Sequence, residues 1–169
     1  MKKLLIILYK FPPMGGVGTR RWVKFSKELI RLGYEVKVLT SDYRYKDKVS
    51  WMQDVDDKIK VYRFKSCYPQ WLLSDTNNNL LIQFKRYANF FLKKTLFYMD
   101  FAQYDAHSVL LRAKEIIKKN SIKNIVVSGP PFSLNYFCSY LKIDEPDLNI
   151  IQDFRDNWND LFYNHFPQR

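Results

Sequence analysis

The stretch LLIILYKFPPMGGVGTRRWVKFSKELIRLG, residues 4–33, contains an apolar run, a glycine-rich turn and an amphipathic segment in direct succession. Residues 4–8 are continuously apolar, which is typical of a parallel strand covered on both faces. In residues 19–32 apolar side chains recur at helical spacing between Lys and Arg, and Gly33 suits the left-handed conformation that ends many helices. The stretch therefore predicts a strand, a loop and a helix, and a second strand follows at residues 36–39.

The same alternation continues along the chain. Residues 42–58 are polar and lack a sustained period, which predicts an irregular connection. Strands that alternate with helices indicate an α/β fold with a parallel sheet, in which ligands collect at the carboxyl ends of the strands. We find no repeat or linker and expect one domain over residues 1–169. The remaining strands are predicted at residues 59–64, 125–127 and 148–151, and the remaining helices at 80–98, 106–120 and from Ser133 to just before residue 144.

The positive charge is unevenly distributed along the chain. The 169 residues are 47% hydrophobic, which favours a folded core over disorder, and their formal net charge is +11. Residues 1–100 contain 20 Lys and Arg against 9 Asp and Glu, whereas residues 101–169 contain eight of each. This asymmetry favours an anionic partner, such as a phosphorylated substrate, an anionic membrane or a nucleic acid, over a surface that only aids solubility.

The cysteines and the apolar runs argue against a disulfide-rich, secreted or membrane-spanning protein. Cys67 and Cys138 lie far apart without metal-ligand spacing, so we expect a reducing, cytosolic compartment and neither a disulfide framework nor a metal site. The apolar run after Lys2 and Lys3 is too short for a signal peptide. No stretch approaches the roughly 18 apolar residues of a membrane-spanning helix.

The glycine-rich turn is the strongest candidate for a binding site. Gly15, Gly16 and Gly18 lie between a predicted strand and a predicted helix, where backbone amides can approach a ligand closely and the helix N-terminus attracts an anion. Arg20 and Arg21 add full positive charges. The spacing matches neither GxGxxG nor GxxxxGK[ST]. The residues leave open a turn with a purely structural role, although the flanking arginines favour anion binding.

Two further segments follow predicted strands. SGPPFS, residues 128–133, is a strand-to-helix turn in which Ser133 is expected to cap the helix. DFRDNW, residues 153–158, places Asp153 and Arg155 on the same side of an extended chain, either as a structural ion pair or to orient a substrate hydroxyl. His107 is expected to be exposed or to cap a helix, and no Ser/His/Asp or Cys/His catalytic arrangement is present.

Residues 80–98 predict an unusually aromatic, basic helix. Such a helix either packs one face on the core or lies on an anionic membrane surface. The residues we expect at a membrane are Lys85, Arg86, Phe90, Lys93, Lys94 and Phe97.

In this order, residues 11–40, 128–137 and 153–158 resemble the N-terminal half of family 4 glycosyltransferases of the GT-B type. The resemblance implies a Rossmann-like parallel sheet with helices on both faces, in an enzyme that transfers a sugar with retention of configuration. The donor would be a nucleotide sugar and the acceptor a glycan or lipid-linked molecule in polysaccharide biosynthesis. Relatives commonly have DFRDPW where this chain has Asn157.

The resemblance also implies the site. Gly15, Gly16 and Gly18 would form a loop that reaches the donor phosphates, and Asp153 and Asp156 are the candidate catalytic residues. The other residues implied to bind donor phosphate or acceptor are Thr19, Arg20, Ser128, Gly129, Pro130 and Arg155. No metal or cofactor is expected besides the nucleotide-sugar substrate, and no nucleic acid partner is expected because no motif for one is present.

Residues 1–169 resemble the acceptor-side domain without its last strands and without the donor-binding domain, so we expect the chain alone to be inactive. A location in the cytoplasm, peripheral on the inner face of the cell membrane, fits lipid-linked acceptors. The alternative that remains open is a noncatalytic peripheral membrane or anion-binding module.

Overall fold

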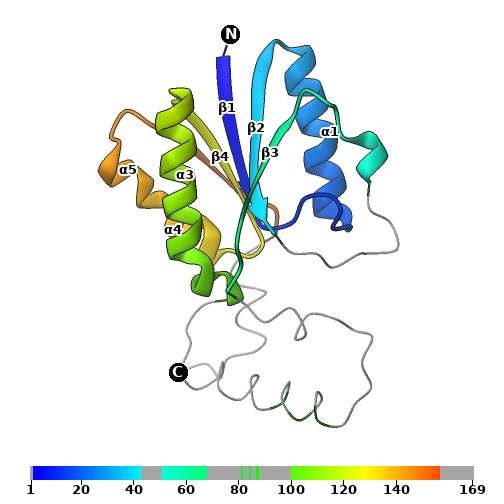
Figure 1. Cartoon of the computed structure of the whole chain (residues 1–169), viewed down its shortest axis with the longest axis vertical. Coiled ribbons are helices and arrows are strands. Elements are labelled where there is room, and N and C mark those ends of the chain that lie inside the picture. The colour runs from blue at the N-terminus through cyan, green and yellow to red at the C-terminus, as the bar shows by residue number, and fades with distance from the viewer. Residues whose placement is uncertain are drawn as a thin grey trace.

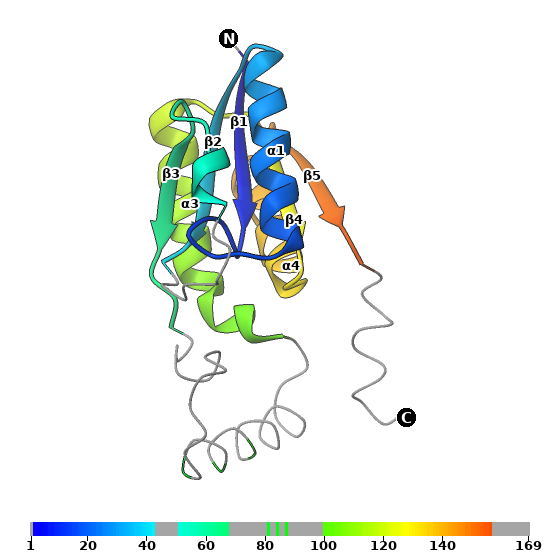
Figure 2. The same cartoon turned by 90° about the vertical axis from the view of Figure 1, so that its right-hand side faces the viewer.

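The computed structural model describes residues 2–42, 51–67, 81, 84, 87 and 100–156. Their strands form one five-stranded sheet in the order β3-β2-β1-β4-β5, and every neighbouring pair is parallel. Figure 1 shows α1 on one side of the sheet and α3, α4 and α5 on the other, and Figure 2 shows β3 and β5 at its two edges. The strands are β1 (Lys2–Leu8), β2 (Tyr34–Ser41), β3 (Lys60–Phe64), β4 (Asn124–Gly129) and β5 (Asn149–Phe154), and the helices are α1 (Val17–Arg31), α3 (Ala106–Asn120), α4 (Ser133–Ser139) and α5 (Leu141–Asp144). The predicted Rossmann-like α/β fold is confirmed.

The alternating side chains of β1 explain why helices cover both faces of the sheet. Successive side chains of a strand point to opposite faces. Leu5 and Ile7 belong to one buried cluster with residues of α3 and α4, whereas Leu4 and Ile6 belong to a second cluster with Trp22 of α1. Each fully buried Leu or Ile contributes roughly 1.5–3 kcal/mol to folding. A continuous apolar run is therefore needed at β1, the central strand of the order.

Several element boundaries differ from the sequence prediction. Helix α1 begins at Val17, two residues early, because Gly16 adopts a non-helical φ of 104° and becomes the N-cap residue. Strand β5 extends to Phe154, because its pairing with β4 continues to the end of that strand, where Phe154 lies opposite Gly129. The expected continuous helix after Ser133 is two short helices, α4 and α5, that meet at Tyr140. The predicted left-handed end of α1 at Gly33 is confirmed, with a φ of 83°.

Two short 3-10 helices in the described part of the chain were not predicted. The first, η1 (Met52–Asp54), lies in the connection expected to be irregular, and the second, η3 (Phe101–Asp105), leads directly into α3. The predicted helix at residues 80–98 falls mostly outside the described residues. Within it, Leu81, Phe84 and Tyr87 are described and are helical.

Candidate anion-binding site

A cleft of about 150 Å³ opens at the carboxyl ends of the central strands. It lies where β1 ends in the glycine-rich turn, beside the end of β4, and the loop between β1 and α1 is visible at the lower ends of the strands in Figure 2. This is the edge at which parallel α/β sheets bind ligands. The residues that line it are Leu8, Tyr9, Lys10, Gly15, Gly16, Val17, Gly18, Thr19, Arg21, Trp22, Ser128, Gly129, Pro130 and Arg155.

The first turn of α1 faces this cleft without a side-chain cap. Gly16 is the N-cap residue, no side chain caps the helix, and the first turn contains no acidic residue. The helical hydrogen bonds begin at Arg20, whose N–H donates to the Gly16 carbonyl at 3.1 Å. The N–H groups of residues 17–19 therefore have no partner within the helix, and they present the positive end of its dipole to the cleft.

The hydroxyl of Thr19 is already used by the loop itself. Its Oγ1 donates to the Gly15 carbonyl at 2.9 Å, and the side chain is buried. Thr19 therefore stabilises the shape of the glycine loop.

Among the described residues three cations line the cleft, and one of them, Lys10, was not predicted. Arg155 was implied by the resemblance, and Arg21 was expected to add positive charge at the glycine-rich turn. The predicted Arg20 does not line the cleft, because its guanidinium lies over the Trp51 ring at 4.5 Å from the centroid. The sequence contained a signal for Lys10, since it lies two residues after the predicted strand at residues 4–8 and before the glycine loop. Arg20 and Arg21 are one residue apart on a helix, so only the packing of α1 selects between them.

Arg21 is held by a chain of hydrogen bonds that joins α1, β4 and β5. The Trp22 indole Nε1–H donates to Ser128 Oγ at 2.7 Å, and the Ser128 hydroxyl donates to Asp153 Oδ2 at 2.6 Å. The same carboxylate oxygen accepts from the Arg21 guanidinium. Asp153, a predicted catalytic candidate, is thus committed to Arg21 and Ser128. These contacts bring together residues of three separate predicted motifs.

The second acidic candidate, Asp156, pairs with the other arginine of the cleft. Arg155 donates from Nε and Nη2 to Asp156 Oδ2 at 2.8 and 2.6 Å. In the described residues Asp153 and Arg155 do not pair with each other, although they lie two residues apart, because each binds a different charged neighbour. The two acids therefore orient arginines in this structure.

The turn after β4 closes the other side of the cleft. Gly129 is required by close packing, because a Cβ at this position would lie 2.6 Å from Phe132 Cδ1 and 2.7 Å from Asn135 Oδ1. The expectation that Ser133 caps the next helix is wrong, since the N-cap residue is Phe132. Instead, the Ser133 hydroxyl and N–H both donate to the Asp100 carboxylate, with an N–Oδ2 distance of 3.0 Å.

A buried carboxylate beside the cleft was missed by the sequence prediction. Asp105 is fully buried, and its Oδ2 accepts from Tyr9 Oη at 2.6 Å and from Ser66 Oγ at 2.7 Å. The backbone N–H of Cys67 donates to its Oδ1 at 2.5 Å. Since Tyr9 also lines the cleft, this network fixes one wall of the site. The available signal was that Tyr9 and Ser66 each follow a predicted strand.

Arg63, on β3, connects the segment before the glycine loop to the end of β2. Its guanidinium donates to the carbonyls of Ser41 at 3.0 Å and Pro12 at 2.6 Å. Burial lowers the pKa of Arg63, and the nearby Asp42 carboxylate opposes this shift. Arg63 therefore ties the glycine loop to β2 instead of offering a free charge.

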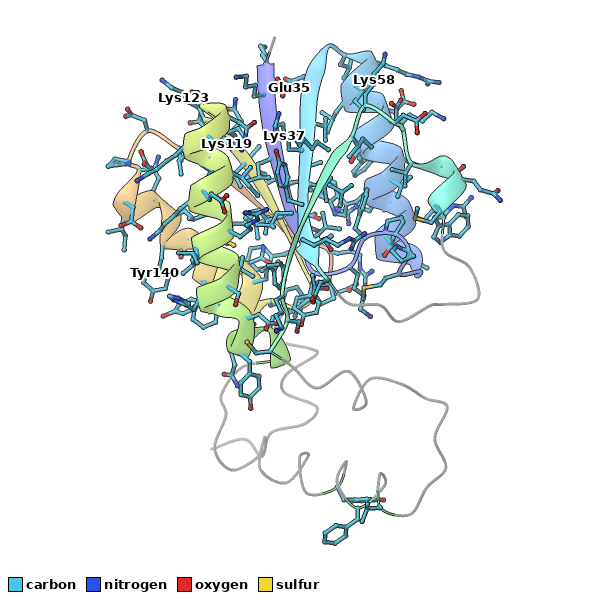
Figure 3. All side chains as sticks on the ribbon, in the orientation of Figure 1. Glu35, Lys37, Lys58, Lys119, Lys123 and Tyr140 are labelled. Carbon is cyan, nitrogen blue, oxygen red and sulfur yellow. The ribbon has the colours of Figure 1, made fainter. Side chains whose placement is uncertain are left out.

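Two lysines of the basic first part, Lys37 and Lys58, lie at the opposite edge of the sheet. Figure 3 shows Glu35, Lys37, Lys58, Lys119 and Lys123 around the amino ends of the strands, away from the glycine loop. Lys37 is buried and paired with Glu35, and burial together with neighbouring lysines lowers its pKa. The total charge therefore does not point to the cleft by itself.

The residues predicted to contact a membrane, Lys85, Arg86, Phe90, Lys93, Lys94 and Phe97, lie outside the described residues. His107 is exposed on α3. In the described ranges no helix is long and apolar enough to cross a membrane, and no group of acidic, histidine or cysteine side chains is arranged to hold a metal ion.

Comparison with solved structures supports the fold. The chain is similar to apo UGT2 of Phytolacca americana, with a TM-score of 0.52 and 12% identity over 91% of this chain and 30% of that chain. The structure of that protein complexed with UDP-2fluoro-glucose and pterostilbene matches with a TM-score of 0.52, 11% identity and the same coverage. No family model matches the sequence, and no curated protein matches it significantly.

The chain thus spans 30% of the length of the solved glycosyltransferase to which it is similar. At 12% identity the similarity shows the fold alone. The five-stranded, all-parallel, Rossmann-like sheet matches one half of a GT-B glycosyltransferase.

Proposed function

We propose that this chain is the acceptor-side domain of a retaining GT-B glycosyltransferase that resembles family 4, and that its cleft receives the diphosphate of a nucleotide-sugar donor. The observation that carries the proposal is the uncapped start of α1, which faces a cleft lined by Lys10, Arg21 and Arg155. Helix N-terminal amides and fixed cations suit a phosphate group. The fold it shares with a UDP-sugar-bound glycosyltransferase supports the same assignment.

In the proposed reaction the bond between the donor sugar and its diphosphate breaks as an acceptor hydroxyl forms the new glycosidic bond. Charge develops on the departing diphosphate oxygen. The amides of the glycine loop and the fixed arginines would stabilise that charge, because preorganised donors act most strongly where charge appears. The acceptor is a glycan or a lipid-linked molecule in polysaccharide biosynthesis, and the domain that completes the donor site is expected elsewhere in the whole enzyme.

Calorimetric titration of the purified chain with UDP tests this proposal. We expect saturable binding that is lost when Gly16 is replaced by Trp, since the side chain would obstruct the loop. Lys119→Ala, at the opposite edge of the sheet, is the control and should retain binding. If the wild-type chain does not bind UDP, or if Gly16→Trp binds equally well, the proposal is wrong.

A second candidate function, attachment to an anionic membrane, is favoured by one observation. Leu81, Phe84 and Tyr87 are helical, are spaced three residues apart, and are 59%, 72% and 76% exposed. Exposed apolar side chains at this spacing, with Lys85 and Arg86 between them in the sequence, fit a helix lying in a membrane interface.

Sedimentation with vesicles tests this second candidate. We expect binding to vesicles containing phosphatidylglycerol and none to neutral phosphatidylcholine vesicles. Phe84→Glu should abolish binding, whereas Leu111→Glu, which changes an apolar residue that is 64% exposed on α3, should not. Equal sedimentation of both variants would contradict this function.

A further inference from the structure

The side chain of Arg155 occupies the space beside Gly18. A Cβ on Gly18 would lie 2.8 Å from Arg155 Nη1, and nothing else lies within 4 Å of it except the neighbouring Cζ of the same guanidinium at 3.9 Å. The guanidinium from the end of β5 is therefore placed directly against the first turn of α1. The N–H groups of this turn have no partner within the helix.

The ion pair between Arg155 and Asp156 leaves Nη1 of Arg155, the nitrogen beside Gly18, available to bind a ligand. Asp156 accepts from Nε and Nη2 of Arg155, so it uses one side of the planar guanidinium. Nη1, which approaches Gly18, is not one of the two nitrogens that donate to that carboxylate. Because a guanidinium has five donors in a fixed plane, an acid that binds one edge also fixes the direction of the remaining donors.

The other two arginines near the loop are more strongly engaged. Arg21 is bound to Asp153 and also lies 5.6 and 5.5 Å from the ring centroids of Trp22 and Phe25. Arg20 is turned over Trp51. Among the described residues, the ion pair of Arg155 is with Asp156, and the two side chains are 35% and 41% exposed.

We propose that Arg155 is the cation that clamps a diphosphate at the first turn of α1, and that Asp156 is its positioning residue. Arg155 and the helix amides then contact the diphosphate side by side, because the guanidinium packs against Gly18, which provides the space for it. Asp153 positions Arg21 in the wall of the cleft. This inference rests on the proposed function, and it replaces a catalytic role for either acid with one of orienting an arginine.

Titration of the chain with inorganic pyrophosphate, UDP and farnesyl diphosphate tests the clamp. Arg155→Gln should weaken binding of pyrophosphate about tenfold or more, since it removes a charge-assisted hydrogen bond. Its control is Arg31→Gln, which removes an arginine paired with Glu28 at the far end of α1 and should leave affinity unchanged. If UDP binds more tightly than pyrophosphate, the diphosphate of the natural ligand belongs to a nucleotide. If farnesyl diphosphate binds more tightly than pyrophosphate, the diphosphate belongs to a prenyl lipid.

Whether Asp156→Asn strengthens or weakens pyrophosphate binding tests the proposed positioning role of Asp156. If Asp156 only lowers the local positive charge, Asp156→Asn should tighten pyrophosphate binding, because a negative charge near an anion has been removed. If it positions Arg155, the variant should bind about threefold more weakly, and Asp156→Glu should restore part of the affinity. Asp147→Asn is the matched control, because it removes an exposed acid at the opposite edge of the sheet.

The outcomes separate this inference from the proposed function. Wild-type binding with no difference between Arg155→Gln and Arg31→Gln overturns the clamp and leaves the diphosphate site standing. Tighter or unchanged binding in Asp156→Asn overturns the positioning role. If the wild-type chain binds none of the three diphosphates, both proposals fail.

Discussion

Two glycines of the same loop are expected to respond to alanine in opposite ways. Gly16 adopts φ 104° and ψ 162°, a region that side chains rarely occupy, yet a Cβ there would meet no atom within 4 Å. Gly18 lies in the first turn of α1, where its Cβ would meet only the end of the Arg155 side chain. Substitution at Gly16 therefore strains the backbone, whereas substitution at Gly18 displaces a flexible group.

The size of each effect follows from these environments. Gly16→Ala should lower the free energy of unfolding by about 1–3 kcal/mol, reduced by the roughly 0.4–1 kcal/mol that alanine contributes by restricting the unfolded chain. In a domain of this size that is a decrease in Tm of up to about 10 °C. Gly18→Ala should leave the Tm unchanged or slightly higher, since alanine is favoured over glycine in a helix by up to about 1 kcal/mol. It should nevertheless weaken pyrophosphate binding.

Thermal unfolding followed by circular dichroism, together with calorimetric titration, measures both quantities on the same samples. Gly33→Ala is the matched control, because Gly33 has a φ of 83°, open space around it and a position at the far end of α1. It should lose stability as Gly16→Ala does and keep its affinity. A Gly16→Ala protein as stable as wild type would refute the backbone argument, and a strongly destabilised Gly18→Ala protein would refute the packing argument.

Three further predictions concern the interior around the cleft. Gly129→Ala should destabilise the protein by about 1–3 kcal/mol in chemical denaturation, because the new Cβ would lie 2.6 Å from the buried ring of Phe132; unchanged stability would contradict this packing. Ser128→Ala removes the acceptor of the buried Trp22 indole and should cost about 1–3 kcal/mol in the same assay, whereas a neutral effect would mean that the indole finds another partner. Burial raises the pKa of the Cys138 thiol to about 12, so Ellman's reagent at mildly alkaline pH should label this thiol only after unfolding, and labelling in the folded protein would argue against its burial.

The fold was predictable because its signals are local and repeated. The apolar run of β1 and the helical spacing of α1 and α3 follow directly from burial on one or two faces. The resemblance implied that the glycine-rich turn and the turn after residue 127 belong to one site, and the structure brings them together because β1 and β4 are neighbours and Leu8 lies opposite Ser128. Element ends were less certain, as β5 showed, because pairing with β4 determines where that strand stops.

The sequence by itself thus determined a parallel α/β sheet and a glycine-rich turn at the start of its first helix. Only the tertiary structure decided which charges face that turn. Arg21 lines the cleft and Arg20 does not, Asp153 binds Arg21, and Arg155 approaches Gly18 from a distant part of the chain. The physical reason is that burial of apolar side chains acts through the periodicity of neighbouring residues. An ion pair or a close contact instead depends on where the folded backbone places two distant side chains.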